Sequence, residues 1–199
     1  MFYKIVRAIV VFLARIIYKI DIKGKENIPK TGGYIVYSNH LYLVDPVILT
    51  YAIWKKLRFM AKKELFKNKF LEKIFLSLGA FPVDRGKGDT GAIDTAVESI
   101  KNGEVFAIYP EGTRSKTGEL GRFKAGLSMV AAKTGADLLP VVIHYSKGMK
   151  PGSRITLKIL PIVKNEELGI TEGSTKSIRA ATLMLQKKTE DGLKEILND

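Results

Sequence analysis

Apolar and polar positions alternate along this chain with two different periods, and each period predicts a kind of element. Residues 1–20 repeat isoleucine and leucine at three- and four-residue steps, which is the spacing of one helix face. Shorter runs of β-branched and aromatic residues, bounded by glycine, proline or charged residues, are typical of buried strands. Such runs predict strands at 34–37, 58–61, 80–83, 104–109, 138–144 and 154–160.

Between these runs the helical spacing returns. It predicts helices at 45–56, 62–78, 92–101, 126–133 and 174–197. Strands that alternate with helices favour an α/β fold, in which helices flank a mixed, largely parallel sheet. Pro140 lacks an amide donor, so we expect it at the beginning of its strand or at an irregular edge. No internal repeat or low-complexity linker divides the chain, which predicts one compact domain over 31–199 and an N-terminal lead-in over 1–30.

The predicted N-terminal helix carries basic and apolar residues on separate stripes. Its basic stripe consists of Lys4, Arg7, Arg15 and Lys19, so this appendage is a basic amphipathic helix. The charges leave no apolar run near the ~20 residues that a membrane span needs, and the small-residue cleavage site of a secretory signal is missing. Two interpretations stay open. The apolar stripe packs on the domain's own core, or the helix lies on an anionic membrane surface, which the helix at 62–78 could extend.

Lysine and arginine outnumber aspartate and glutamate by 33 to 20, which gives a formal net charge of +13. Such an excess indicates an anionic partner: nucleic acid, anionic lipid headgroups or a phosphorylated substrate. The chain has no cysteine, which excludes disulfides, thiolate metal sites and a cysteine nucleophile. Its two histidines, His40 and His144, lack the spacing of a zinc motif. His144 has no partner by spacing, so we assign it a structural role.

A candidate for acid–base chemistry follows the first of the predicted strands. His40 comes just after the strand at 34–37, and Asp45-Pro46 reads as a helix start, because aspartate is a favoured cap and proline suits the first helical position. A turn between them brings His40 back toward Asp45. A carboxylate that accepts from one imidazole nitrogen leaves the other nitrogen free to take a proton. The alternative is a buried histidine beside a helix cap, and the motif alone does not decide between the two.

Three further groups of polar residues also follow predicted strands. Asp84-Arg85-Gly86 follows 80–83, Glu111-Gly112-Thr113-Arg114 follows 104–109, and a glycine-rich loop with Lys124 continues from there. The basic residues of that loop suit a phosphate; they are Arg114, Lys116, Arg122 and Lys124. Ligand sites of open α/β sheets collect at the carboxyl ends of strands, so we expect these groups to converge on His40. Taken singly, each could be no more than an ion pair at a strand end.

Residues 86–91 also fit the G-x-G-x-x-G pattern of dinucleotide sites, with Glu111 at the end of the next predicted strand. However, Asp84 and Arg85 separate the apolar strand from the first glycine, where a dinucleotide site would bring that glycine close to the pyrophosphate. The strand is also not near the start of the domain. We therefore favour a glycine-rich surface loop over nucleotide binding.

Together these blocks resemble the glycerolipid acyltransferases, most closely the 1-acylglycerol-3-phosphate O-acyltransferases. The matching blocks are, in order, Asn39-His40-x4-Asp45, Phe81-Pro82-Val83-Asp84-Arg85, Tyr109-Pro110-Glu111-Gly112-Thr113-Arg114-Ser115 and Leu139-Pro140-Val141-Val142. The first and third blocks are specific as a pair, whereas the second and fourth are weak alone. The resemblance covers about 31–143 and leaves the carboxyl-terminal part unassigned.

The resemblance implies an acyltransferase domain over 31–199. It moves a fatty acyl group from a thioester, either of acyl-carrier protein or of coenzyme A, to the free hydroxyl of a lysophospholipid. The acceptor implied is 1-acylglycerol 3-phosphate, which gives phosphatidic acid, although glycerol 3-phosphate stays open. By the same resemblance the residue roles are general base for His40, orientation of that base for Asp45, acceptor placement for Glu111, and phosphate binding for Arg85 and Arg114, with Lys124 a further candidate. The thioester is a co-substrate, and no cofactor or metal is expected.

Elementary chemistry agrees with direct transfer. The substrate's own hydroxyl attacks the thioester, so the protein needs a base but no nucleophile, and the chain indeed has neither cysteine nor a G-x-S-x-G motif. Backbone amides near Gly112 and Thr113 are our candidates for stabilising the oxyanion. We expect a monotopic enzyme on the cytoplasmic face of the cell membrane, bound to its anionic surface and not to nucleic acid. The alternative is a basic membrane-surface or nucleotide-binding module without acyl transfer, which explains the charge but leaves the polar blocks without a purpose.

Overall fold

The computed structural model describes residues 2–83, 90–171 and 173–198. Its centre is a seven-stranded sheet with the strand order β1-β7-β6-β2-β5-β3-β4. The strands are β1 (Lys19–Lys23), β2 (Ile35–Ser38), β3 (Leu57–Lys62), β4 (Ala80–Val83), β5 (Val105–Ile108), β6 (Leu138–Tyr145) and β7 (Arg154–Ile159). Within the described residues all neighbouring strands are parallel except β6 and β7, which are antiparallel. The predicted mixed, largely parallel sheet is therefore confirmed.

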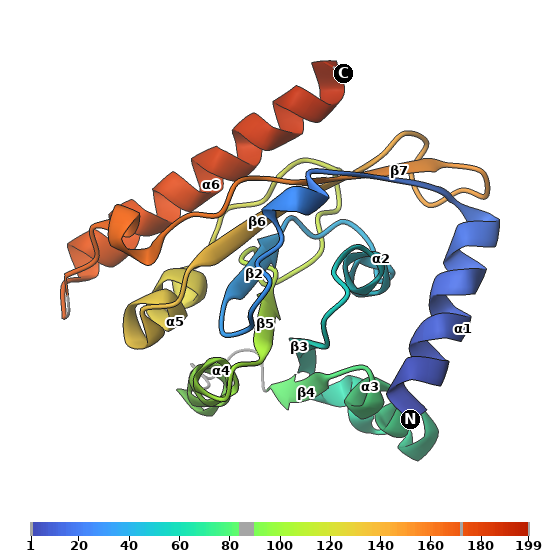
Figure 1. Ribbon diagram of the computed structural model, residues 1–199, viewed down its shortest axis with the longest axis horizontal. Coiled ribbons are helices and arrows are strands. Elements are labelled where there is room, and N and C mark those ends of the chain that lie inside the picture. The colour runs from blue at the N-terminus through green and yellow to red at the C-terminus, as the bar shows by residue number, and fades with distance from the viewer. Residues whose placement is uncertain (1, 84–89, 172, 199) are drawn as a thin grey trace.

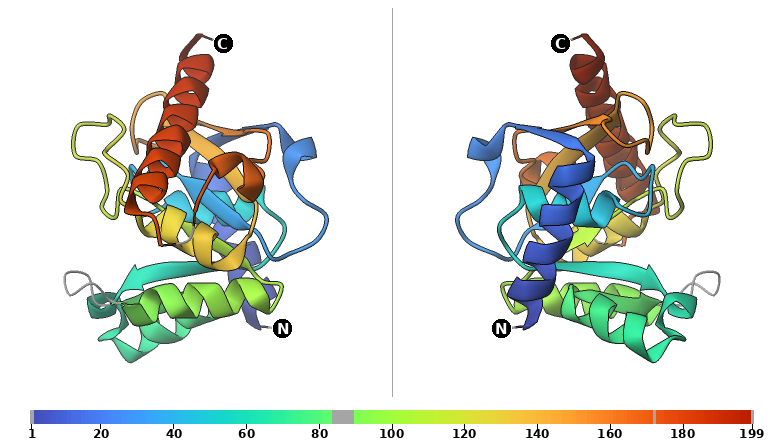
Figure 2. Two further views of the ribbon diagram at one scale, coloured as in Figure 1. Left: turned by 90° about the vertical axis from the view of Figure 1, so that its left-hand side faces the viewer. Right: turned by 90° about the vertical axis from the view of Figure 1, so that its right-hand side faces the viewer.

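Helices cover both faces of this sheet (Figure 1). One face carries α1 (Phe2–Ile17), α2 (Asp45–Ala52) and α3 (Lys69–Ser77), and the other carries α4 (Thr90–Lys101), α5 (Gly126–Thr134) and α6 (Thr175–Asn198). Short 3-10 helices are η1 (Lys25–Asn27), η2 (Lys63–Phe66) and η3 (Asn165–Leu168). The two opposite views of Figure 2 place α6 in front in one and α1 in front in the other, so these two helices lie on opposite sides of the molecule.

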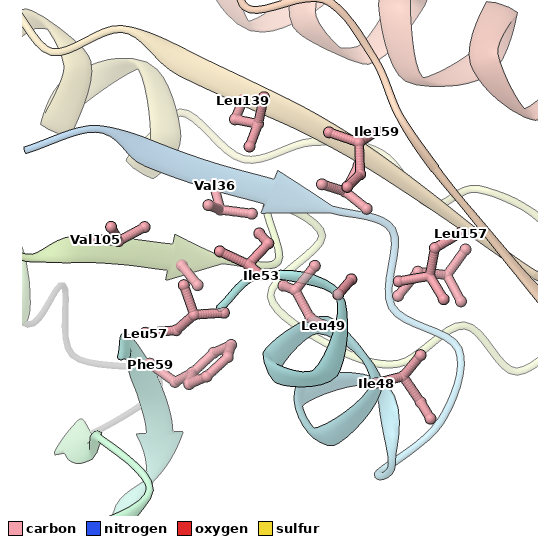
Figure 3. Packing of buried hydrophobic residues seen from close by; sticks show 14 of the residues in the cluster. Val36, Ile48, Leu49, Ile53, Leu57, Phe59, Val105, Leu139, Leu157 and Ile159 are labelled. Atoms are coloured by element: carbon pink, nitrogen blue, oxygen red, sulfur yellow. The ribbon is translucent and has the colours of Figure 1, made fainter. Parts of the chain in front are cut away.

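The core consists of two apolar layers, one on each face of the sheet. Along β2 the side chains alternate between them, because Val36 belongs to one layer and Ile35 and Tyr37 belong to the other. On the first face α2 contributes Ile48 and Leu49, which pack with residues of the strands (Figure 3). A strand that is buried on both faces reads as a continuous apolar run, which explains why β2, β5 and β6 were visible in the sequence.

The sequence did not predict strand β1. The predicted N-terminal helix continues to Ile20, but α1 ends at Ile17 and the next residues pair in parallel with β7. The segment Lys19-Ile20-Asp21-Ile22-Lys23 alternates with a period of two, and both isoleucines pack against the core. The expected lead-in thus contributes an edge strand to the sheet.

The helix predicted at 62–78 is divided in the structure. β3 extends to Lys62, η2 follows, and α3 begins only at Lys69. The Asn68 side chain accepts hydrogen bonds from the amides of Phe70 (2.9 Å) and Leu71 (3.2 Å), which caps a new helix. The prediction was wrong here because a 3-10 turn continues the three-residue apolar spacing that we took for one helix. The helix predicted at 45–56 is also shorter, because α2 ends at Ala52.

Pro140 is the third residue of β6, an internal strand, and not its beginning. Its carbonyl accepts from the Leu160 amide at 3.0 Å, just beyond the last β6–β7 pair, Val141 with Ile159. The amide nitrogen and carbonyl of a strand residue face the same neighbour, so the missing donor faces the end of β7. Pro140 lies inside an internal strand, and the prediction that it marks the beginning of its strand or an irregular edge was wrong.

Candidate active site

The site begins where β2 stops pairing with β6. Asn39 is buried, and its side chain forms two hydrogen bonds with the backbone of Ile143 in β6. Asn39 Nδ2 donates to the Ile143 carbonyl and Asn39 Oδ1 accepts from the Ile143 amide, both at 2.9 Å. The side-chain amide thus takes the place of a backbone partner, and the main chain is released to turn away from the sheet. The next residue, His40, is therefore carried out of the sheet at its carboxyl edge.

The expected contact between His40 and Asp45 is present. His40 Nδ1 lies 2.8 Å from Asp45 Oδ2, and the same oxygen accepts from the amides of Leu41 (2.6 Å) and Tyr42 (2.8 Å). The other oxygen, Oδ1, accepts from the Tyr145 hydroxyl at 2.6 Å. Asp45 is fully buried, and these four donors compensate the loss of water around its carboxylate.

Asp45 does not cap the helix, which corrects one part of the prediction. It is the first residue of α2, and its side chain faces backward, toward the turn that precedes the helix. The carboxylate is already occupied by the amides of that turn and by His40, so it cannot also receive the first amides of α2. Proline lies in the first turn, as expected, because that turn needs no amide donor there.

The contact with Asp45 also indicates the tautomer of the neutral imidazole. Because a carboxylate only accepts hydrogen bonds, the neutral ring of His40 carries its proton on Nδ1 and leaves Nε2 as the basic nitrogen. Nε2 has no hydrogen-bond partner among the residues that the structure describes. The Tyr109 ring stacks on the imidazole with a centroid distance of 4.1 Å and an interplanar angle of 17°. Asp45 and Tyr109 therefore hold the ring from its edge and from its face.

The third sequence block meets His40 through the backbone. β2 and β5 are parallel neighbours with Tyr37 opposite Ile108, so three residues later along each strand His40 and Glu111 come together. Glu111 Oε1 accepts from the His40 amide at 2.7 Å, and the Ser115 amide donates to the His40 carbonyl at 2.8 Å. The backbone amide and the carbonyl of His40 are thus both hydrogen-bonded to the loop after β5.

Both carboxylate oxygens of Glu111 are occupied by the protein itself. Oε2 accepts from the Gly121 amide at 2.8 Å, and a Cβ atom at position 121 would lie only 2.6 Å from this oxygen. Burial raises the pKa of Glu111 above its ordinary value, and the amides of His40 and Gly121 oppose this increase. In this arrangement Glu111 holds the loop at 111–121 against His40.

A pocket of about 510 Å³ opens beside His40. Its walls come from α1, α2, β3 and α3 and are mostly apolar, whereas basic side chains and the loop after β5 border it. The apolar lining includes Val11, Leu43, Pro46, Val47, Phe59, Met60, Ala61, Leu65, Phe75, Leu78 and Ala80. The polar lining includes Arg7, Lys62, Thr113 and Arg114. A long apolar group can therefore lie next to the histidine with an anionic group nearby.

The remaining predicted site residues take different positions. Gly112, Thr113 and Arg114 line the pocket together with His40. Lys124 is exposed and does not line it, but its Nζ would lie 2.8 Å from a Cβ atom at Gly112, so it lies next to the loop. Arg85 lies outside the described residues, as does most of the glycine-rich run at 86–91.

The backbone amides at the pocket are not equally available. The Gly112 amide donates to the Tyr109 carbonyl at 3.0 Å and closes a turn in which Gly112 has a φ of 71°. The Thr113 amide, in contrast, has no acceptor in the part of the chain that the structure describes. Of the two predicted oxyanion donors, only Thr113 is therefore free in this conformation.

Sequence reasoning did not assign roles to Asn39, Tyr109 or Tyr145. Asn39 and Tyr109 belong to the sequence blocks that carry the resemblance, but roles were assigned there to other residues, such as His40 and Glu111. Tyr145 could have been placed on the core face with Val141 and Ile143, because residues alternate along a strand. His144 lies opposite Thr156 in the ladder of β6 and β7 and points to the other face from Tyr145.

Two general features complete the description of the site. Within the described residues, no three His, Asp or Glu side chains gather as metal ligands. Among those residues there is also no helix that is both long and apolar enough to cross a membrane. The fold and the site together define an α/β protein in which a histidine–aspartate pair at the carboxyl edge of a parallel sheet borders an apolar pocket.

The chain belongs to the acyltransferase family. Residues 19–144 match the family described as Acyltransferase, and this range contains the histidine, the aspartate and the loop after β5.

Two bacterial relatives are similar to this chain over part of their length. The 1-acyl-sn-glycerol-3-phosphate acyltransferase of Bacillus subtilis is 35% identical over 122 residues, which cover 61% of this chain and 60% of that protein. The Borreliella burgdorferi protein of the same name is 33% identical over 128 residues, or 63% of this chain and 51% of that protein. The chain thus spans about half to three fifths of the length of these relatives.

A solved structure shares the fold over nearly the whole chain. It is the 1-acyl-sn-glycerophosphate acyltransferase PlsC of Thermotoga maritima, which has a TM-score of 0.77 and 26% sequence identity to this chain. The comparison covers 97% of this chain and 79% of that protein.

Proposed function

We propose that the protein transfers an acyl group from an acyl thioester to the free hydroxyl of a lysophospholipid, with 1-acylglycerol 3-phosphate as acceptor and phosphatidic acid as product. Its family and the names of its relatives support this activity. The observation that carries the proposal is the contact of His40 Nδ1 with Asp45 Oδ2 at 2.8 Å, because it turns a basic nitrogen toward an apolar pocket that Arg114 borders.

In this mechanism His40 Nε2 takes the proton of the acceptor hydroxyl, while the oxygen of that hydroxyl attacks the carbonyl carbon of the thioester. The resulting imidazolium is stabilised by the buried carboxylate of Asp45. The tetrahedral intermediate then expels the sulfur, which leaves as a thiol with the proton from His40. The Thr113 amide is our candidate for donating to the oxyanion. No group of the enzyme becomes acylated, which fits a chain without cysteine.

The acceptor's phosphate would be bound at the rim of the pocket. Arg114 is exposed there, next to Thr113, and a guanidinium can bind two phosphate oxygens at once. Lys124, next to Gly112, adds positive charge to the same loop. Arg85 follows β4 in sequence and stays a candidate for the same role. We assign Glu111 to holding His40 and not to the acceptor, since both of its oxygens are occupied.

The protein would bind the membrane surface through α1 and α3. Apolar side chains of α1 face solvent, with exposed fractions of 54% for Ile9, 64% for Phe12 and 67% for Ile16, whereas Ala14 of the same helix is buried. Phe70 on α3 and Trp54 after α2 are exposed as well. Their exposure supports the membrane-surface interpretation over packing of the whole stripe on the core. An exposed apolar stripe on a chain of net charge +13 suits a monotopic position on an anionic surface, and a chain without cysteine suits the reducing, cytoplasmic side.

The test is an assay of thiol release with acyl-carrier protein and coenzyme A thioesters as donors and with 1-acylglycerol 3-phosphate and glycerol 3-phosphate as acceptors. Loss of the general base is expected to lower the rate by about 10²- to 10⁴-fold. His40→Ala and Asp45→Ala should therefore abolish most transfer and leave vesicle binding unchanged. Normal turnover in either variant would show that His40 and Asp45 do not act as general base and orienting residue. Vesicle binding by the unaltered protein without transfer to any acceptor would favour the non-enzymatic basic module.

A further inference from the structure

The two oxygens of Asp45 are held in different ways. Oδ2 receives three donors, namely His40 Nδ1 and the amides of Leu41 and Tyr42, all from the turn that precedes α2. Oδ1 receives the hydroxyl of Tyr145 at 2.6 Å, from the last residue of β6. Tyr145 is the one contributor to this carboxylate, among the described residues, that comes from a distant part of the chain.

Tyr145 is rigidly placed and stays a donor. It is buried, and its ring packs edge-on against Tyr42 with a centroid distance of 4.7 Å and an interplanar angle of 78°. Burial, and after it the charge of Asp45, raises the pKa of Tyr145, so the hydroxyl keeps its proton at all working pH values. The backbone of β6 is also bound to Asn39, the residue before His40. One strand thus fixes both the peptide that leads to the base and the carboxylate that orients it.

We infer that Tyr145 is a positioning residue of the histidine–aspartate pair. Its hydroxyl fixes the rotation of the Asp45 carboxylate and withdraws part of the negative charge from the oxygen that faces His40. The reaction that this pair serves rests on the proposed function, but the effect of Tyr145 on the imidazole does not. A carboxylate torsion has a broad minimum, so a donor on each oxygen is needed to hold it. A donor to the far oxygen also withdraws negative charge from the oxygen that faces the imidazole.

The direction of the expected pH effect follows from this. Without the Tyr145 hydroxyl, Asp45 presents more charge to His40, which favours the protonated imidazolium. A higher pH is then needed before the ring can act as a base. The other titratable groups that act on Asp45 or on Tyr145 are Glu111, Tyr109 and Tyr18. Replacing Tyr145 by phenylalanine leaves these unchanged, so the effect can be attributed to one hydroxyl.

The variant is Tyr145→Phe, and the matched control is Tyr34→Phe. Tyr34 belongs to the same apolar layer, and its buried hydroxyl has no hydrogen-bond partner among the described residues. In Tyr145→Phe we expect the acid limb of the kcat/KM profile for acyl transfer to move to higher pH by about half to one unit. At neutral pH kcat should fall about tenfold with little change in KM, whereas Tyr34→Phe should follow the unaltered protein.

A second readout needs no substrate. With ¹⁵N-labelled histidine, the His40 signals of Tyr145→Phe should titrate at higher pH than those of the unaltered protein, and the Nδ1 proton should exchange faster. If the unaltered protein shows no acyl transfer but this shift occurs, the proposed function fails and the role of Tyr145 stands. If the folded variant matches the unaltered protein in both the pH profile and the histidine titration, the inference is wrong, even where the variant is less stable.

The inference can also be tested if Tyr145→Phe does not fold. In the unaltered protein with ¹³Cζ-labelled tyrosine, the Tyr145 signal should shift with the same midpoint as the His40 titration, because both contact one carboxylate. The Tyr34 signal should stay flat. A Tyr145 signal that does not respond while His40 titrates would overturn the inference.

Discussion

Asn39 directly follows Ser38, the last residue of β2 that pairs with β6, and its side-chain amide makes the two hydrogen bonds to Ile143 that a backbone would otherwise make. The two bonds have opposite directions, since one needs a donor and the other an acceptor. Only an amide side chain supplies both from the same branch point. The position of His40 therefore depends on the chemistry of its neighbour as well as on the turn to Asp45.

Asn39→Asp tests this dependence with almost no change of shape. An aspartate oxygen would replace Nδ2 and lie 2.9 Å from the Ile143 carbonyl, so two acceptors would face each other in a buried site. We expect the free energy of unfolding to fall by about 2–4 kcal/mol and transfer to be impaired. Urea unfolding and the transfer assay measure both effects. The control is Asn102→Asp, the same change at an exposed position; an equal loss of stability in the two variants would contradict the role of Asn39.

Glu111 predicts a pH dependence of stability. Burial raises its pKa in the folded protein, so the folded state holds this proton more tightly than the unfolded state. The stabilising contribution of this group is therefore fully present below its ordinary pKa and is lost as the pH rises through the raised one. Glu111→Gln removes this titration, so the stability advantage of the unaltered protein over the variant should shrink as the pH rises from about 4 toward neutrality. Chemical unfolding across this range provides the measurement, and an advantage that grows instead would contradict the burial argument.

Helix α1 turns two of its basic side chains toward the domain and several of its apolar side chains toward solvent. Arg7 donates from Nε (3.3 Å) and Nη2 (3.0 Å) to the Thr50 carbonyl in the last turn of α2, and its guanidinium lies 4.8 Å from the centroid of the Trp54 ring. Arg15 lies over the Tyr51 ring. A cation at the carboxyl end of a helix is stabilising. Arg7 and Arg15 thus join α1 to the domain, while the apolar side chains of Ile9, Phe12 and Ile16 are left exposed.

This orientation gives a prediction for α1 as an element. Phe12→Asp with Ile16→Asp should weaken binding to vesicles that contain anionic lipid by at least tenfold, because each exposed side chain would otherwise bury its apolar surface in the membrane. The thermal transition should change little, since both residues are already exposed to water. Leu183→Asp, on the opposite side of the molecule in α6, is the matched control. Vesicle sedimentation measures the effect, and equal binding by all three proteins would exclude α1 as the docking element.

The elements that the sequence predicted correctly keep one hydrophobic pattern over their whole length. β2 and β5 are continuous apolar runs. Because parallel pairing brings the ends of two strands together, the meeting of His40 with the block at 109–115 could be anticipated. β1 is only five residues long with lysine at both ends, and its period of two was hidden behind the stronger helical period of α1. Tyr145 could not be assigned, because the local pattern does not reveal that β6 is the neighbour of β2.

At the scale of the whole molecule, the pocket and the proposed membrane-binding surface share the same helices. Val11 of α1 and Phe75 of α3 line the pocket, whereas Phe12 and Phe70 of the same helices are exposed. In the proposed function, an acyl chain that leaves the membrane would therefore meet the pocket without crossing open water. The net charge of +13 alone could not predict this arrangement, since it depends on which faces of α1 and α3 turn inward.

The pairing of β1 also constrains the order in which the chain can fold during synthesis. α1 and β1 leave the ribosome before the rest of the described chain, but β1 pairs with β7, whose last residue is Ile159. A strand whose partner is so distant in sequence cannot join its sheet until most of the chain has been made. Over that interval α1 is a nascent amphipathic helix without its docking place on the domain. In the proposed mode of membrane binding, α1 would hold the growing chain at the membrane surface while the sheet is still incomplete.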